Sequence, residues 1–579
     1  MASPMASTSA GIPSMQSQSR SGEKNSKRVS LPIRHTVTAF DRGLITQSLI
    51  DAEGELKEHK MELNRLKAAI IAVEGRRAAV ERDIKGYRSL LSPIQKMPPE
   101  ILTEIFGYCS HDVDMSGEAM PMPIVISMVC GRWREQALST PSMWSSINIY
   151  ISPQNDEGPD KDWLRMLRLT RLFLERSSTS RLKVDLTWFT NGLATDPEID
   201  VVLVDHIMEA LHWNTHRLYD FRLKFTSVLA HNFSFQRLRT SYPILRRLEL
   251  SINEYTDGFE VYAAPTNFFE ILPALHSVSL IGKWAKSGLI VPWGTLSTLH
   301  LSGNVTGLRS MLTSCTNLRR LELHDMGIPA MDYYAQEGQI FSNIEQLSIT
   351  CTTSISCLAH ILEHLTLPCV STLELNCVIF IYRSGPLALE ALEDLLVRSG
   401  CNITSFSLNR VIFPSPTSLV PLLYRMPTIR DLTFEELTED SLEGDVHNLT
   451  VISPFLHHLD RNHRESSSVS NPAGPFLPQL TDLKLIVHED GLEEDSLMNA
   501  IGSRWSDRGS FVVNDSQPPA NLDVVTLKSV EIGVLTWNEQ LSESILGLEC
   551  FRDAGLRISV RWIQPTPFLL SPCHEPIIR

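Results

Sequence analysis

Apolar residues recur at heptad spacing along residues 45–91. Twelve of the fourteen a and d positions in this stretch can sit in an apolar seam, and the two exceptions are His59 and Arg77. A run of about six heptads exceeds the three or four that indicate a coiled coil. We therefore predict a coiled-coil helix over residues 43–91 that pairs in parallel with a second copy of the chain, as a homodimer. A single long helix folded against the rest of the chain is the alternative.

The residues before this helix, 1–42, have a different composition. They are rich in Ser, Met and Pro and contain few large aliphatic residues, so they cannot bury enough apolar surface to offset the entropy lost on ordering. We predict a disordered tail. Within it, Lys24, Lys27 and Arg28 form a basic cluster that is either a nuclear signal or solvated charge.

Two short amphipathic helices are predicted between residues 92 and 150. The segment 97–109 begins with Met97, two prolines and Glu100, an order that suits a helix start. The apolar stripe of this first helix consists of Ile101, Leu102, Ile105 and Phe106. The second helix follows a polar, Met-rich loop and ends before Pro141, because proline cannot continue a helix. One face of the second helix holds Ile126, Val129, Cys130, Trp133 and Ala137, and Trp144 follows.

Beyond residue 151 the apolar pattern changes to repeated L-x-x-L-x-L triplets, each of which predicts a short buried strand. The eleven copies begin at residues 218, 245, 275, 296, 318, 344, 370, 403, 429, 480 and 522. The first nine starts are about 26 residues apart on average, within the range of leucine-rich repeats. We therefore predict an α/β fold in which residues 151–579 form an irregular leucine-rich-repeat solenoid. Residues 151–160 have the composition of a linker or surface loop.

The segments that follow the predicted strands are less regular. Asparagine stands three residues after the last leucine at Asn253 and Asn304, but Met326 and Thr352 occupy the corresponding positions in other copies. A continuous ladder of asparagine side chains is therefore not predicted. Near the C-terminus, residues 556–560 alternate between apolar and polar and are predicted to form the closing strand.

The middle residue of each L-x-L points away from the core, because side chains alternate along a strand. Stacked repeats would align these residues on one concave face: Glu249, Ser279, His300, Glu322, Ser348, Glu374, Ser407, Thr433, Lys484 and Thr526. The row is polar and slightly acidic, which suits a basic or polar protein segment. We predict that it binds a protein target, with Glu249, His300, Glu322 and Glu374 as the target-binding residues. A solvated face without a partner is the alternative.

Charge and composition disfavour several classes of protein. The 67 Asp and Glu residues outnumber the 52 Lys and Arg residues, and the formal net charge of −15 disfavours nucleic-acid binding. The sequence has neither a stretch of 18 apolar residues nor the apolar core of a signal peptide, so we expect no membrane partner and a location in the cytoplasm, the nucleus or both. The ten cysteines are scattered, and we expect free thiols.

Motifs for catalysis and metal binding are absent from the sequence. It contains no P-loop, no G-x-S-x-G, no H-E-x-x-H and no dinucleotide fingerprint. The nearest candidate metal ligands are His457, His458, Asp460 and His463, whose spacing is common by chance. We therefore expect a protein that is not an enzyme, with no catalytic residue, no metal and no cofactor. An enzyme whose motif is unrecognisable is a minor alternative.

The predicted helix pair resembles a known module. The segments MPPEILTEIF, VCGRWR and PSMW are similar to the F-box, whose pattern runs L-P-x-E-[IL]-L-x-x-[IL]-F, then V-C-[RK]-x-W, then a proline followed by a tryptophan. Met97 replaces the usual leucine, and the loop between the helices is longer than typical. The resemblance implies an F-box-like domain over residues 92–150 that binds a Skp-type adaptor. Together with the apolar stripes, it points to these adaptor-binding residues: Pro98, Ile101, Leu102, Ile105, Phe106, Val129, Cys130, Trp133 and Trp144.

The order of tail, coiled-coil helix, F-box-like domain and repeats is similar to that of the expanded F-box families of mushroom-forming fungi. This resemblance implies a substrate-receptor subunit of a cullin-RING ubiquitin ligase of the SCF type. In that family the adaptor joins the F-box protein to a cullin, and the repeats hold a target for ubiquitination. Such a subunit raises the local concentration of the target and contributes no nucleophile. A non-catalytic scaffold or sensor acting outside a ligase is the alternative.

Overall fold

The computed structural model describes residues 38–563 with internal gaps. The longest gaps are residues 152–158, 189–196, 227–238, 254–268, 327–338, 378–388, 437–450, 461–474, 506–523 and 536–547. Residues 1–37 of the tail predicted over residues 1–42 lie outside the described residues. The basic cluster of Lys24, Lys27 and Arg28 falls within this part. The chain divides into two compact units, residues 1–98 and residues 99–579.

The first unit contains one long helix, α1 (Ala39–Leu91), and the 3-10 turn η1 (Pro93–Lys96). Thr38 caps the start of α1: its hydroxyl accepts a hydrogen bond from the N–H of Asp41, whose carboxylate accepts one from the N–H of Thr38. The helix ends just before Pro93, as the sequence predicts. The helical prediction is confirmed, although α1 begins at residue 39 rather than 43. The pairing of α1 with a second copy stays a prediction.

The second unit begins with a small helical module. It comprises α2 (Pro99–Tyr108), α3 (Met122–Val129), α4 (Gly131–Leu138) and the 3-10 turn η2 (Pro141–Trp144). The prediction of one continuous helix that carries Val129, Cys130 and Trp133 on one face is wrong, because Cys130 is extended, with φ −158° and ψ 171°, and separates α3 from α4. Its thiol accepts a hydrogen bond from the N–H of Trp133 and so caps α4. Val129 and Ala137 therefore do not share a face.

A parallel sheet of fourteen strands follows, with the strands in chain order. They are β1 (Ser146–Ile151), β2 (Leu182–Trp188), β3 (Leu218–Thr226), β4 (Arg247–Asn253), β5 (Ser277–Ile281), β7 (Thr298–Ser302), β9 (Arg320–His324), β11 (Gln346–Cys351), β13 (Thr372–Cys377), β14 (Ser405–Asn409), β15 (Asp431–Glu435), β16 (Asp482–His488), β17 (Ser529–Leu535) and β18 (Arg557–Ile563). The pairs β6 (Trp284–Ala285) with β8 (Val305–Thr306) and β10 (Gln339–Ile340) with β12 (Leu365–Thr366) form two small sheets. The mixed α/β class is thereby confirmed.

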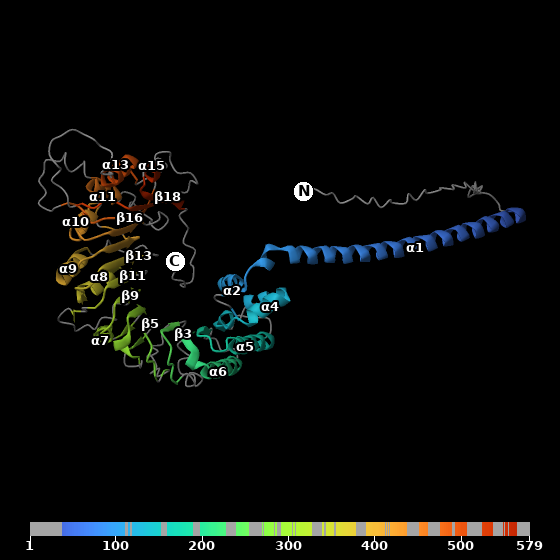
Figure 1. Ribbon diagram of the computed structural model, residues 1–579, viewed down its shortest axis with the longest axis horizontal. Coiled ribbons are helices and arrows are strands. Elements are labelled where there is room, and N and C mark those ends of the chain that lie inside the picture. Colours follow the sequence, from blue (N-terminus) through green and yellow to red (C-terminus); the bar gives the residue numbers. More distant parts are fainter. Residues whose placement is uncertain are drawn as a thin grey trace, which may run out of the picture. The chain divides into compact units, whose positions relative to one another are not determined.

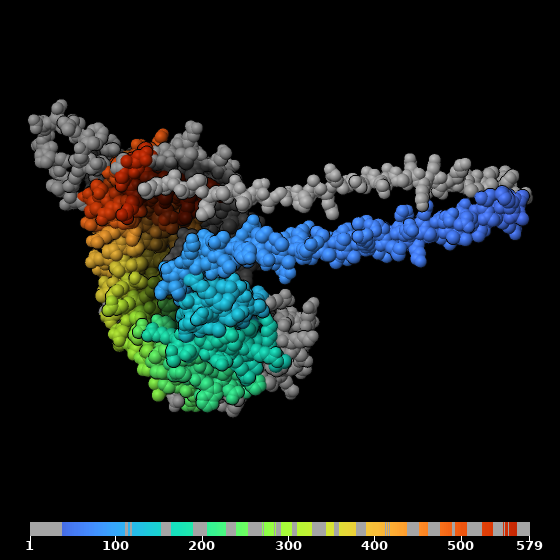
Figure 2. Space-filling view, turned by 45° about the vertical axis from the view of Figure 1, so that its right-hand side comes forward, coloured from blue at the N-terminus to red at the C-terminus, as the bar shows by residue number. Residues whose placement is uncertain are grey.

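Helices connect many of the strands. They are α5 (Pro159–Arg176), α6 (Pro197–His212), α7 (Leu308–Ser314), α8 (Ile355–His364), α9 (Leu389–Ser399), α10 (Leu419–Tyr424), α11 (Ile452–Leu459), α13 (Glu494–Trp505) and α15 (Cys550–Asp553). Figure 1 shows α7 to α10 along one side of the sheet, and Figure 2 shows the successive repeats stacked in chain order from green to red. The core lies between sheet and helices, since the leucines of each strand are buried, as at Leu299 and Leu301 of β7. Such a stack is consistent with a solenoid.

The predicted strands agree with this sheet except at the C-terminal end. Every triplet but the last places its second and third apolar residues on a strand between β3 and β16. The last triplet is misplaced: β17 begins at Ser529, and its buried side chains include Val530 and Ile532. The closing strand predicted over residues 556–560 is confirmed as β18. The bounds of the linker predicted over residues 151–160 are wrong at both ends, because Ile151 is the last residue of β1 and α5 begins at Pro159.

The chain leaves several strands through a turn with positive φ instead of an asparagine ladder. Gly282, Gly303, Asp325 and Arg410 have φ values of 103°, 87°, 48° and 57°. Each donates its backbone N–H to a carbonyl at the end of the next strand, for example Gly282 to Ser302 at 2.8 Å. This backbone ladder satisfies the polar groups at the sheet edge. Because these hydrogen bonds are made by the backbone, the ladder needs no asparagine side chain at these positions.

Candidate protein-interaction surfaces

The helical module exposes many apolar side chains for its size. They are Ile101, Ile105 and Tyr108 of α2, Met122, Val125, Met128 and Val129 of α3, and Leu138 of α4. Each of these three helices is ten residues or shorter. Exposed apolar side chains concentrated in this way are typical of a surface that binds another protein.

Other apolar residues of the module form its interior. Leu102, Phe106 and Trp144 are buried. The indole N–H of Trp144 donates to the carbonyl of Ala137 at 2.8 Å, and its ring lies 5.0 Å from that of Phe173 on α5. The Phe106 ring lies 4.8 Å from the ring of Trp133. These contacts join α2 and α4 to the first helix of the repeats.

The nine predicted adaptor-binding residues therefore divide by exposure. Leu102, Phe106 and Trp144 are interior residues, which a partner cannot touch in this conformation. Ile101, Ile105 and Val129 are exposed, as is Pro98 at the end of the first unit. Cys130 and Trp133 are half-buried. The sequence pattern did not single out Met122, Val125 and Met128, since they precede or interrupt the apolar face predicted for one continuous helix.

The row predicted on the sheet is continuous from β4 to β16. Its members are register partners on adjacent strands: Glu249, Ser279, His300, Glu322, Ser348, Glu374, Ser407, Thr433 and Lys484. Thr526 is not in the row, because β17 contributes Glu531 opposite Lys484. The row extends in the other direction to Arg222 and Asp185. We call the sheet face that carries this row the open face.

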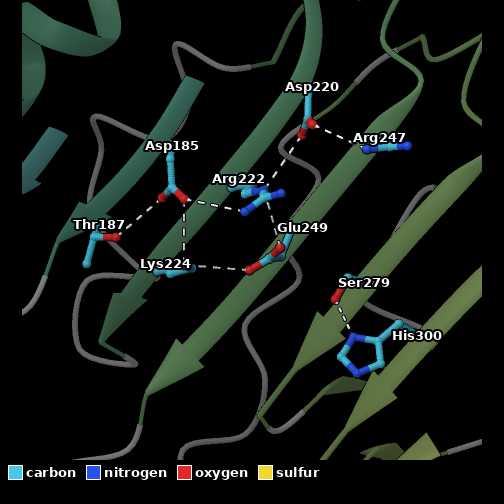
Figure 3. A network of polar contacts seen from close by, with 9 residues as sticks. All are labelled: Asp185, Thr187, Asp220, Arg222, Lys224, Arg247, Glu249, Ser279 and His300. Atoms are coloured by element: carbon cyan, nitrogen blue, oxygen red, sulfur yellow. Dashed lines mark hydrogen bonds and ion pairs between the residues drawn. The ribbon is translucent and has the colours of Figure 1, made fainter. Parts of the chain in front are cut away.

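Glu249 belongs to a network of opposite charges on β2, β3 and β4 (Figure 3). Its carboxylate lies 3.6 Å from Arg222 and 3.8 Å from Lys224. Asp185 lies 3.6 Å from Lys224 and 4.0 Å from Arg222. Burial raises the pKa of Glu249, while Lys224 and Arg222 act in the opposite direction. The charge of Glu249 is therefore balanced within the chain.

The same network includes Asp220, which lies 3.8 Å from Arg222 and 4.0 Å from Arg247. Burial raises the pKa of Asp220 too, and Arg222 and Arg247 oppose this effect. Three carboxylates thus face three cations on adjacent strands. This part of the open face stabilises itself and presents no surplus charge to a target. Only Glu249 of these six residues was recognised from the sequence, because the L-x-x-L-x-L pattern does not show which charges become neighbours.

His300 and Glu322 lie next along the row. Ser279 Oγ is 2.7 Å from Nδ1 of His300, and burial lowers the pKa of the imidazole, opposed by Glu322. His300 is therefore predominantly neutral at pH 7. Glu322 pairs with Arg320 on the same strand. Both of these predicted target-binding residues already have partners within the chain.

Among the three predicted target-binding glutamates, Glu374 has the least compensated carboxylate. It accepts a hydrogen bond from the amide of Asn376 at 3.1 Å, and it makes no ion pair with any described residue. Asn376 in turn donates to Thr350 and accepts from Asn409, so hydroxyl and amide groups connect β11, β13 and β14. The open face is therefore mostly neutral and hydrogen-bonding around Glu374. It is the part of the predicted surface best suited to bind polar groups.

The candidate histidine cluster and other possible metal ligands lie partly within the described part of the chain. There, no group of three or more His, Cys, Asp and Glu side chains is arranged to hold a metal ion. His457 and His458 lie on α11, with His457 Nε2 3.5 Å from Glu493, while His463 lies outside the described residues. Among the helices that are described, none is long and apolar enough to cross a bilayer.

Comparison of the chain with protein-family models gives no match, and no curated protein matches it.

Proposed function

We propose that this chain is the substrate-receptor subunit of a cullin-RING ubiquitin ligase of the SCF type. In this proposal the module from α2 to η2 is an F-box that binds a Skp-type adaptor, and the adaptor connects it to a cullin. The parallel sheet and its helices are a leucine-rich-repeat array that holds a protein target. The chain itself supplies no catalytic group.

The exposed apolar side chains of the module carry this proposal. Leu102, Phe106 and Trp144 are buried in the interior of the module. Ile101, Ile105 and Val129 are exposed at its surface. A module whose core is already formed gains nothing in stability from further large aliphatic residues in water. Burial of such side chains against a partner contributes about 25 cal/mol per Å² of apolar area. An apolar groove on an adaptor is the kind of surface that they fit.

The target-binding surface of the proposal is the open face around Glu374, from β9 to β15. Its half-buried hydroxyl, amide and carboxylate groups suit a polar or basic segment of a protein. Glu249 is less suited to this role than the sequence suggested, because Arg222 and Lys224 neutralise it. Ubiquitin transfer then depends on holding the target near the conjugating enzyme, which is an effect of proximity.

The test compares two exposed valines that differ in location. Val129 on α3 is 57% exposed and Val397 on α9 is 67% exposed, so aspartate is tolerated at both positions in the free chain. Val129→Asp places a charge in the proposed adaptor interface and should weaken adaptor binding at least about tenfold. Val397→Asp is the matched control and should bind the adaptor like the unmodified chain. Purified Skp-type adaptor and the full chain are mixed, and binding is measured by calorimetry.

The outcomes separate the proposed function from its main rival. If the unmodified chain does not bind the adaptor and does not co-purify with a cullin, the chain is a scaffold or sensor outside a ligase. Equal affinities for Val129→Asp and the unmodified chain would refute the assignment of the interface. Leu102→Asp is a further control: it should disrupt the fold of the module, which a loss of protection from hydrogen exchange in α2 would reveal.

A further inference from the structure

Helix α1 presents all of its side chains to solvent in a single chain. It spans 53 residues without a buried one, which corresponds to a rod about 80 Å long at 1.5 Å per residue. Ion pairs of its side chains link residues within the helix, such as Arg65 with Glu62 and Arg77 with Glu81. A helix of this length with exposed leucines and isoleucines lacks the tertiary packing that normally stabilises helices.

The apolar residues of α1 are not distributed evenly around it. Leucine or isoleucine occupies six of the seven a positions, 49, 56, 63, 70, 84 and 91. Two of the glycines, Gly54 and Gly75, fall at f positions, on the side opposite the seam. A side chain added at either glycine would meet no atom within 4 Å. Large apolar side chains are therefore concentrated at the a positions, while two of the f positions are glycines.

The charged residues at the e and g positions, which flank the a and d positions, indicate which helix binds to this face. In a parallel, in-register pair, each g residue faces the e residue of the next heptad on the other helix. The g–e pairs then are Glu55 with Lys60, Glu62 with Lys67, Arg76 with Glu81, and Asp83 with Arg88. All four are attractive, and the two remaining g–e combinations contain an uncharged residue. Each attractive pair occurs twice in a symmetric dimer.

The antiparallel arrangement gives a different result. With the helices fully overlapped, so that a positions face d positions, g residues face g residues and e residues face e residues. This arrangement opposes Glu55 to Asp83, Glu53 to Glu81 and Lys67 to its own counterpart. Only Glu62 with Arg76 and Lys60 with Glu74 remain attractive. The flanking charges thus complement a second copy of this helix in parallel.

We propose that α1 pairs with α1 of a second copy of this chain, in parallel and in register, over residues 45–91. Arg77 at an a position opposes its counterpart in such a pair and lowers its stability. The cost is limited, because the long side chain reaches the helix surface, where its guanidinium lies 3.3 Å from Glu81. This inference is independent of the proposed function, since it needs neither adaptor nor cullin. Its consequence is that each assembly carries two open faces, which increases avidity for a multivalent target.

The first test compares two adjacent isoleucines in the full chain. Ile70 at an a position is 57% exposed and Ile71 at a b position is 69% exposed, so a single chain hardly distinguishes them. Light scattering of the unmodified protein should give about 130 kDa, twice the chain mass of 65.1 kDa. Ile70→Asp should give the monomer mass at micromolar concentration, and Ile71→Asp should stay a dimer. A monomeric unmodified protein, or equal behaviour of both variants, would overturn the proposal.

The second test exchanges charges and keeps the apolar seam intact. Glu62→Lys alone and Lys67→Glu alone each replace two attractive pairs by repulsive ones and should raise the dimer dissociation constant about tenfold or more. The double variant restores attraction between positions 62 and 67 in the parallel dimer and should recover the original constant. In the antiparallel arrangement the double variant instead places a lysine at position 62 opposite Arg76, and it places two glutamates opposite each other at position 67. Because Lys67 already faces its own counterpart there, the antiparallel arrangement predicts a double variant as weak as Glu62→Lys alone. A double variant that recovers no affinity relative to Glu62→Lys would therefore refute the parallel orientation.

Discussion

Gly282 offers the strictest test of the repeat geometry. It follows β5 with φ +103°, a conformation that residues with a side chain rarely adopt. A Cβ at this position would also lie closer than 3.0 Å to the carbonyl oxygen of Ile252, at the end of the neighbouring strand. That oxygen belongs to the backbone, so only a displacement of the strands relieves the contact. We expect Gly282→Ala to separate β4 from β5 locally.

The magnitude follows from two costs. Adoption of the left-handed conformation by alanine costs about 1–2 kcal/mol. The steric overlap adds a further ~1–3 kcal/mol, comparable to overpacking in a core. Gly303 increases this second cost, because it stacks on Gly282 and a shift there disturbs the next repeat. We therefore expect Gly282→Ala to lower the free energy of unfolding by about 3 kcal/mol.

Substitutions at two other glycines measure the conformational cost and the steric cost separately. Gly555 also has φ +103° but has open space around it, so Gly555→Ala should lose only the conformational part, about 1–2 kcal/mol. Gly294 has no positive φ, and its nearest neighbour would be 3.6 Å from a Cβ, an ordinary contact. Gly294→Ala should be neutral or stabilising by up to about 1 kcal/mol, because alanine restricts the unfolded chain.

The assay combines urea denaturation with hydrogen exchange. Circular dichroism gives the unfolding midpoints, and hydrogen exchange locates the loss, because repeat arrays can open in parts. We expect faster exchange in β4 and β5 for Gly282→Ala alone. If Gly282→Ala is no more destabilising than Gly555→Ala, the close approach to Ile252 does not exist in solution. The stacking of repeats at this turn would then be wrong.

Two further predictions concern a buried arginine and a partly buried histidine. Arg504 on α13 is buried and donates to the carbonyls of Leu459 at 3.0 Å, Leu477 at 3.2 Å and Phe476. Arg504→Met leaves these acceptors unsatisfied and should lower the free energy of unfolding by about 3 kcal/mol in the same urea assay. A loss below about 1 kcal/mol would contradict this role of Arg504. His300 has a pKa below 6.5 through burial, so unfolding takes up a proton and the free energy of unfolding should fall as the pH drops below about 6.5. His300→Gln should reduce this decline between about pH 7 and 5, and an unchanged pH profile would show that His300 is not buried as described.

The local patterns of the sequence determined much of the fold. Heptad spacing, together with Pro93, predicted the helix that became α1, since both act through neighbouring residues of one chain segment. The L-x-x-L-x-L triplets predicted strands β3 to β16, and even the alignment of Glu322, Ser348 and Glu374, because a buried strand exposes alternate residues and parallel stacking preserves the register. The pattern failed at β17, where Leu522, Val525 and Leu527 imitate a strand that starts only at Ser529.

Other features were decided only by contacts between segments distant in the sequence. The break at Cys130 accompanies the packing of α4 against both α3 and α2, and the contacts of α2 separate buried Leu102 from exposed Ile105 in what looked like one apolar stripe. Likewise, Glu249 looks like a free acid in its own strand, yet β3 brings Arg222 and Lys224 beside it. Periodicity reports which side of an element faces inward. Which charges neutralise each other, and which apolar residues remain for a partner, depends on neighbours that only the tertiary structure supplies.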